Sequence, residues 1–256
     1  MKTMIRGEQI VKSFGAGAEK TRVLDEVSVE IREGEFVSVM GPSGSGKSTL
    51  MYALSGMDSI DGGRVIFGDK ELSALPEQEL ADLRRTRMGF VFQQPTLLKN
   101  LNLLDNIILP SMRDNRKNAA GLVEKARALM QKTGIAELEK RETAQVSGGQ
   151  LQRAGICRAL MGNPQVIFGD EPTGALNSSA AEEIMELLSA INEEGTTVVL
   201  VTHDAKVAAR SGRILFMRDG AIVSELLLPR SGGGSGPKDM DSRVKAVLAR
   251  MQELGI

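Results

Sequence analysis

The sequence predicts an α/β fold built around a mainly parallel β-sheet. Three short apolar runs of strand length, at residues 36–40, 166–168 and 196–201, alternate with segments whose apolar residues recur at helical spacing. Strands that alternate with helices are typical of parallel sheets whose faces are covered. The chain has 256 residues and 41% apolar side chains, enough for a sizeable core in one large domain or two small ones.

The first elements follow one another closely. Apolar and polar side chains alternate from residue 22 in the manner of a strand, and a polar turn at 32–35 precedes the apolar run at 36–40. The pattern becomes helical at Ser48 and ends at Gly56, a residue type that commonly terminates helices. A second helix opens at residues 76–77 and carries Leu80 and Leu83.

Predicted helices and strands also alternate in the middle and towards the end of the chain. Residues 95–146 form a helical block with Leu122, Ala126, Leu129 and Met130 on one face. The strands at 166–168 and 196–201 enclose a helix with apolar residues at 184, 187, 188 and 191. Asp219-Gly220 lies between two apolar runs and predicts a tight hairpin.

The C-terminal region has a separate character. Residues 230–237 form a linker by their glycine and serine content, whether natural or engineered. Residues 238–256 carry an apolar stripe at helical spacing. This amphipathic helix has two interpretations, a cap that folds back on the core or a docking helix for a partner. The stripe consists of Val244, Val247, Leu248, Met251 and Leu254.

Composition excludes several classes of protein. The net charge is −1, so no strong positive field attracts nucleic acid or an anionic bilayer. The single cysteine, Cys157, rules out an intrachain disulfide and a cysteine-based zinc site. The N-terminus lacks the apolar core of a signal peptide, and no run approaches 18 apolar residues. We therefore expect a cytoplasmic chain that does not enter the membrane.

A glycine-rich segment after the strand at 36–40 matches the phosphate-loop pattern G-x-x-x-x-G-K-[ST]. Its glycines let backbone N–H groups converge on phosphate oxygens, and the following helix directs its positive end at the same anion. Lys47 can neutralise the charge of the β- and γ-phosphates, and the Ser48 hydroxyl is suited to act as a ligand of Mg²⁺. The segment consists of Gly41, Pro42, Ser43, Gly44, Ser45, Gly46, Lys47, Ser48 and Thr49.

Two acids, Asp170 and Glu171, follow the apolar strand at 166–168. In proteins that transfer phosphoryl groups, an acid at such a strand end holds Mg²⁺, and a neighbouring group orients the attacking water. Solvated acids at a strand exit are the alternative interpretation. The nearby phosphate loop favours the catalytic one.

Five further motifs occur in the rest of the chain. Phe14 ends Lys-Ser-Phe near the N-terminus, and Gln93 follows the apolar segment 89–92. Residues 146–150 are Val, Ser147, Gly148, Gly149 and Gln150. Residues 172–177 read PTGALN, and His203, the only histidine, follows the strand at 196–201.

Residues 1 to about 229 therefore resemble the nucleotide-binding subunits of ABC (ATP-binding cassette) transporters. The resemblance implies a P-loop NTPase (RecA-like) core with a mainly parallel sheet, an N-terminal antiparallel β subdomain and an α-helical subdomain at about 95–160. It implies ATP hydrolysis with Mg²⁺. It also implies two copies that pair head to tail, with each ATP between the phosphate loop of one copy and Ser147-Gly148-Gly149 of the other.

The resemblance also assigns individual roles. Glu171 would act as general base, with His203 and Lys47 stabilising the transition state. Ser48, Gln93 and Asp170 would hold Mg²⁺, with Gln94 a weaker candidate than Gln93. Phe14 would stack on adenine, and Ser147–Gln150 would bind the γ-phosphate; alternatively, Phe14 is a core residue and Ser147 an ordinary helix cap.

ATP hydrolysis would drive a separate membrane permease, which would dock at about residues 93–109 and on the helical block that follows. The permease would hold the chain at the inner face of the membrane. The sequence resembles the branch of macrolide exporters, lipoprotein-release complexes and bacitracin-type peptide-resistance transporters. Asn177 stands where relatives usually carry aspartate, which predicts altered cross-talk between two active sites. The alternatives are a soluble ABC-type ATPase, an ATP-gated clamp without turnover, or a P-loop kinase.

Overall fold

The computed structural model describes residues 2–15, 17, 20–115, 118–228 and 237–256. It divides into two compact units, the first comprising residues 1–80 and 197–256 and the second residues 81–196. Each unit is described by itself below. In the described part of the chain, no helix is long and apolar enough to cross a membrane.

The first unit contains an antiparallel sheet of strands in the order β2-β1-β4-β5. β1 and β2 pair along most of their length, with several register shifts. Sequence patterning did not identify β1 or β4, because β1 is interrupted by these irregularities and mixes polar with apolar residues. The strands are β1 (Thr3–Phe14), β2 (Thr21–Arg32), β4 (Gly62–Phe67) and β5 (Lys70–Glu71).

A second group of strands in the same unit forms its buried centre. Every residue of β3 (Phe36–Met40) and β8 (Thr197–Val201) is buried, as expected for parallel strands covered on both faces. β3 pairs in parallel with β8 on one side and β9 (Arg213–Arg218) on the other. β10 (Ala221–Leu227) returns antiparallel to β9, which confirms the predicted hairpin at Asp219-Gly220.

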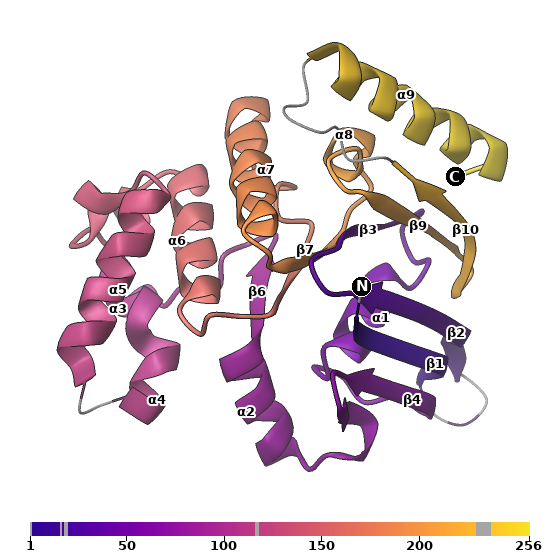
Figure 1. The fold of residues 1–256 in the computed structure, drawn as a ribbon, viewed down its shortest axis with the longest axis horizontal. Coiled ribbons are helices and arrows are strands. Elements are labelled where there is room, and N and C mark those ends of the chain that lie inside the picture. Colours follow the sequence, from indigo (N-terminus) through magenta and orange to yellow (C-terminus); the bar gives the residue numbers. More distant parts are fainter. Residues whose placement is uncertain (1, 16, 18–19, 116–117, 229–236) are drawn as a thin grey trace. The chain divides into compact units, whose positions relative to one another are not determined.

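Three helices complete the first unit. α1 (Lys47–Leu54) follows β3, and the single turn α8 (Ala205–Ala208) follows β8. α9 (Pro237–Leu254) lies beside α8 (Figure 1). Four of its five stripe residues pack on the core: Val247 is fully buried, and Val244, Met251 and Leu254 are partly buried against the same cluster. Leu248 stays 50% exposed. The structure therefore favours the cap interpretation for most of this stripe. Residues 230–236 of the predicted linker lie outside the described residues.

The second unit combines two parallel strands with a group of helices. β6 (Met88–Phe92) pairs with β7 (Val166–Asp170). The predicted apolar face is buried at Leu122, Ala126 and Met130, in a cluster that also contains Cys157. The helices are α2 (Glu77–Arg87, which starts in the first unit), α3 (Leu103–Ile108), α4 (Met112–Asn115), α5 (Ala119–Lys132), α6 (Gly148–Leu160) and α7 (Ser178–Glu193).

Parallel and antiparallel strands, together with covering helices, confirm the predicted α/β class with its antiparallel N-terminal sheet. Short 3₁₀ turns connect several of these elements. They lie at Leu72–Ala74, Leu109–Ser111, Ala136–Leu138 and Thr143–Gln145.

Candidate nucleotide-binding and catalytic site

The glycine-rich segment forms the connection between β3 and α1 in the first unit. α1 begins at Lys47, and Gly46 caps it with a left-handed backbone at φ 96°. The Lys47 ammonium is buried and donates a hydrogen bond to the carbonyl oxygen of Pro42 at 2.8 Å. This hydrogen bond folds the lysine back over its own loop.

The loop fits a phosphate group. Ser45 is 3% exposed, and its hydroxyl has no hydrogen-bond partner among the described residues. A side chain built on Gly44, at φ 80°, would meet no atom within 4 Å, so this part of the loop faces open space. The other side is closed, because a Cβ on Gly41 would lie 2.1 Å from the carbonyl oxygen of Met217. An unsatisfied buried hydroxyl in an open glycine-rich turn is the environment that an anion requires.

The hairpin between β9 and β10 supports the loop from behind. The N–H group of Gly220 donates to the carbonyl oxygen of Ser45 at 3.2 Å, and the Gly220 carbonyl accepts from the N–H of Asp25 at 3.0 Å. Only a residue without a side chain fits there, because a Cβ on Gly220 would lie 2.7 Å from the carbonyl oxygen of Val23. The Asp-Gly turn was predicted, but its position behind the loop depends on tertiary pairing that no local pattern specifies.

His203 lies at the same edge of the sheet as the phosphate loop. Val39 and Val201 are register partners near the ends of parallel strands β3 and β8, and the N–H of Thr202 donates to the Val39 carbonyl oxygen at 3.1 Å. His203 follows directly and is exposed. The carboxyl ends of parallel strands are where α/β proteins place their ligands.

Phe14 is exposed at the end of β1, with 48% of its surface accessible. The ammonium of Lys12 lies 5.1 Å from the centre of its ring. This lysine is itself held by the Asp58 carboxylate at 2.8 Å and the carbonyl oxygen of Ser59. The exposed ring excludes the core interpretation and is compatible with stacking on a base.

In the second unit, Gln93, Asp170 and Glu171 lie at one edge of the β6–β7 pair. Phe92 is the register partner of Asp170, so the residues that follow the two strands are neighbours. Glu171 adopts a left-handed backbone at φ 47°, a conformation that disfavours residues other than glycine. Such local strain is concentrated at functional sites.

The side chain of Gln93 lies against the turn that follows Glu171. A Cβ added to Gly174 would be 2.9 Å from the Gln93 Nε2 atom, so the glycine makes room for the amide. The turn itself is closed by a hydrogen bond from the Gly174 N–H to the Glu171 carbonyl oxygen at 3.0 Å. These contacts bring the predicted glutamine and the predicted base into one local structure.

The Ser-Gly-Gly-Gln segment forms the start of α6. The Ser147 hydroxyl accepts from the N–H of Gln150, and the Gln150 side chain accepts from the N–H of Ser147, forming a capping box. A Cβ on Gly149 would lie only 3.2 Å from the Cβ of Ala180, whereas one on Gly148 would make an ordinary contact with Leu176 at 3.5 Å. The cap interpretation and the anion-binding interpretation therefore apply to the same segment, because the helix end also presents backbone N–H groups.

Asn177 has a clear local role as the N-cap of α7. Its Oδ1 atom accepts a hydrogen bond from the N–H of Ala180 at 2.9 Å. Aspartate and asparagine both provide an acceptor for this hydrogen bond at the start of a helix. The asparagine therefore retains the cap while removing a negative charge.

A metal ion would have to be shared with the nucleotide. Within the described ranges, no group of three or more histidine, cysteine, aspartate or glutamate side chains could hold one. Mg²⁺ commonly takes one or two protein oxygens together with water and substrate phosphates. The Ser48 hydroxyl, the Gln93 amide oxygen and the Asp170 carboxylate fit that ligand class.

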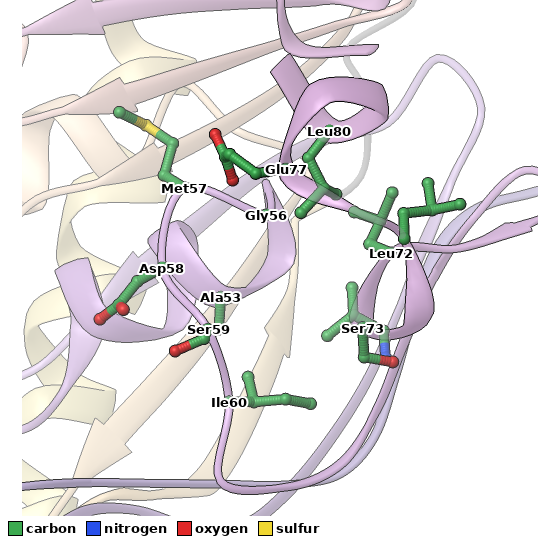
Figure 2. Close-up of a pocket in the computed structure, with 12 residues that line it drawn as sticks. Ala53, Gly56, Met57, Asp58, Ser59, Ile60, Leu72, Ser73, Glu77 and Leu80 are labelled. Carbon is green, nitrogen blue, oxygen red and sulfur yellow. The ribbon is translucent and has the colours of Figure 1, made fainter. Parts of the chain in front are cut away.

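A separate cavity of about 180 Å³ lies in the first unit (Figure 2). Its wall combines apolar side chains such as Ile60 and Leu72 with polar groups such as Asp58 and Glu77. None of the predicted site residues lines it, so it forms no part of the candidate site.

Comparison with protein families gives a match to the model of the family described as ABC transporter, over residues 24–174. The ABC transporter ATP-binding protein MJ0796 of Methanocaldococcus jannaschii is 44% identical over 227 residues, which cover 87% of this chain and 96% of that protein. The macrolide export ATP-binding/permease protein MacB of Aggregatibacter actinomycetemcomitans is 40% identical over 222 residues. Those residues cover 87% of this chain but only 34% of MacB, so the chain spans about a third of that relative's length.

Solved structures agree with these matches. A dimeric structure of the ATP-binding cassette MJ0796, in a post-hydrolysis state bound to ADP and Pi, has a TM-score of 0.82 at 38% identity. It matches 89% of this chain and 100% of that one. A nucleotide-free ATP-binding cassette from an ABC transporter has a TM-score of 0.80 at 27% identity, covering 99% of both chains.

Proposed function

The chain belongs to the ABC transporter family and is an ATPase of that family, and we propose that two copies close head to tail around two ATP molecules to drive a separate membrane permease. The observation that carries the proposal is the pair of anion-binding segments. One is the phosphate loop before α1, and the other is Ser147-Gly148-Gly149 at the start of α6. The dimeric MJ0796 structure with ADP and Pi supports this arrangement.

The phosphate loop binds the nucleotide of its own copy. The N–H groups of Gly44–Lys47 and the Ser45 hydroxyl donate to phosphate oxygens, which satisfies the buried hydroxyl that has no partner among the described residues. Lys47 exchanges the Pro42 carbonyl oxygen for the β- and γ-phosphates. Phe14 stacks on the adenine. The Ser147–Gln150 segment of the second copy, called the signature segment below, donates its helix N–H groups to the γ-phosphate.

Glu171 is the general base that takes a proton from the attacking water. His203 contacts the γ-phosphate from the end of β8 and, with Lys47, stabilises the transition state. Ser48, Gln93 and Asp170 are the residues that would hold Mg²⁺. The ion would supply positive charge to compensate the phosphate oxygens.

The permease docks on the second unit, in the region of residues 93–109, and holds the chain at the inner face of the membrane. Leu98 and Leu109 are large apolar residues exposed in this region, as expected for a contact surface. The process that is driven is export of, or resistance to, peptide antibiotics or related amphiphiles. The similarity to MacB, a macrolide export protein, supports the export part of this proposal.

The test is size-exclusion chromatography with light scattering on Glu171→Gln, with and without ATP and Mg²⁺, alongside turnover of the unmodified chain. Replacing the base by its amide should slow hydrolysis by about 10²–10⁴-fold and leave ATP binding intact. We expect a monomer without nucleotide and a dimer with ATP and Mg²⁺. Turnover that Glu171→Gln does not reduce would contradict the assignment of the base, and a monomer under both conditions would contradict closure without the permease.

A further inference from the structure

Arg243 of α9 is a buried charged residue to which the proposed mechanism gives no role. Only 9% of its surface is exposed. Its Nε atom donates to the carbonyl oxygen of Ala209 at 2.7 Å, and its Nη2 atom to that of Ser211 at 2.7 Å. Burial lowers its pKa because desolvation disfavours the charged form. The two hydrogen bonds hold the planar guanidinium in one orientation and offset part of the free-energy cost of burying its charge.

The two carbonyl groups that Arg243 binds end the segment that begins with His203. α8 is one helical turn, and Asp204 caps its start by accepting from the N–H of Lys206 at 2.7 Å. At its other end, the Ser211 hydroxyl donates to the carbonyl oxygen of Ala208 at 2.7 Å. The segment from 204 to 211, which directly follows His203, is therefore internally bonded. A displacement of its end is transmitted to its beginning.

α9 is attached to the phosphate-loop side of the unit as well. Val247 is buried in one apolar cluster with Ala208 and with Met40, the residue before Gly41. Near its end, the carbonyl oxygen of Leu254 accepts from Arg218 Nη1 at 2.8 Å, and Arg218 lies beside the Asp219-Gly220 turn that supports Ser45. The helix thus contacts the supports of both catalytic elements in the first unit.

We propose that Arg243 is a positioning residue for ATP hydrolysis, which holds α8 in place and thereby fixes His203 at the γ-phosphate. The proposal rests on the proposed function, because it assigns a consequence to the position of His203. It gives α9 a role beyond covering apolar surface. Arg243 itself touches neither nucleotide nor water.

The experiment uses the fact that His203 is the only histidine in the chain. Its imidazole Cε1–H group gives one signal in a ¹H–¹³C NMR spectrum, so its surroundings are observed without reference to activity. Arg243→Gln and Arg243→Lys are compared with Arg250→Gln on the same helix. Arg250 is partly exposed and pairs with Glu253 at 3.2 Å. Circular dichroism and thermal melts establish that each variant is folded.

Arg243→Gln is expected to shift the His203 signal and to lower kcat about tenfold, less than the hundredfold that a displacement of 1 Å can cost. The dissociation constant for ATP should change less than about threefold, since the phosphate loop is retained. Arg243→Lys, which keeps the charge but not the fork of donors, should be intermediate in both readouts. Arg250→Gln should change neither.

An unchanged His203 signal in folded Arg243→Gln would overturn the proposal, whatever the kcat. A shifted signal with unchanged kcat would overturn it too, because the position of His203 would then not limit hydrolysis. If Arg243→Gln is unfolded, Arg243→Lys decides by the same criteria. Absence of turnover in the unmodified chain would contradict the proposed function and this proposal together, whereas normal turnover in all variants contradicts this proposal alone.

Discussion

The Nε2 atom of Gln152 donates a hydrogen bond to the carbonyl oxygen of Phe92 at 2.9 Å. Gln152 lies two residues beyond the Ser-Gly-Gly-Gln segment on α6, and Phe92 immediately precedes Gln93. One buried side chain therefore connects the helix of the signature segment to the strand that carries the predicted magnesium ligand. The sequence motif ends at Gln150, and no spacing pattern indicates a contact between Gln152 and Phe92.

Gln152→Met should lower the free energy of unfolding by about 1 kcal/mol, the usual contribution of one hydrogen bond. The loss is small because the Oε1 atom of Gln152 is buried without a hydrogen-bond partner among the described residues, and methionine removes that cost. Urea denaturation measures the change, with Gln131→Met at an exposed position of α5 as the control. A loss above about 3 kcal/mol would indicate a larger network than this single bond.

Asn177→Ala should cost about 1 kcal/mol, because the N–H of Ala180 loses its acceptor. Asn177→Asp should keep the cap and add about 0.3–1 kcal/mol, since a negative charge is favourable at a helix start. Thermal melts measure both, with Ser178→Ala as the neighbouring control. In ATPase assays, Asn177→Asp should alter the cooperativity between the two sites. Unchanged turnover and cooperativity would contradict the cross-talk hypothesis.

Cys157 should be inert in the native protein. Burial raises the pKa of its thiol from 9.0 to about 11, while the Thr133 hydroxyl at 3.1 Å acts in the opposite direction. Since the folded state holds the proton more tightly, this group's contribution to stability is full below pH 9 and falls as the pH rises towards 11. A thiol-reactive reagent at pH 8 should label the chain only in denaturant. Stoichiometric labelling of the native protein would contradict the burial of this side chain.

Phe14→Ala should weaken ATP binding about 5- to 150-fold if the ring stacks on adenine, since base stacking contributes about 1–3 kcal/mol. Phe14→Trp should retain ATP binding. Because the chain contains no tryptophan, this variant has a single one, at position 14. Its fluorescence then reports the affinity directly in a nucleotide titration. Exposed Leu227→Trp, on β10, is the control and should show no nucleotide-dependent change. A normal affinity in Phe14→Ala would contradict the stacking role.

The sequence predicted most of what depends on local spacing. The phosphate loop, the acids after β7 and the SGGQ helix start each combine residue types in a fixed order, and strand or helix patterns flank them. Tertiary support was not predictable in this way. Periodicity identified the apolar stripe around Val247, but it does not specify which surface covers that stripe. The contacts of Gly220 with Ser45, and of Arg243 with Ala209, join residues far apart in the chain, and no pattern links them.

The left-handed backbone of Glu171 means that stability and catalysis favour different residues at this position. Glycine would adopt φ 47° without the penalty of about 1 kcal/mol that a side chain incurs there. A population of variants selected for thermal resistance alone should therefore drift towards glycine at position 171 and lose the proposed base in doing so. Retention of the glutamate is then a signature of selection for turnover.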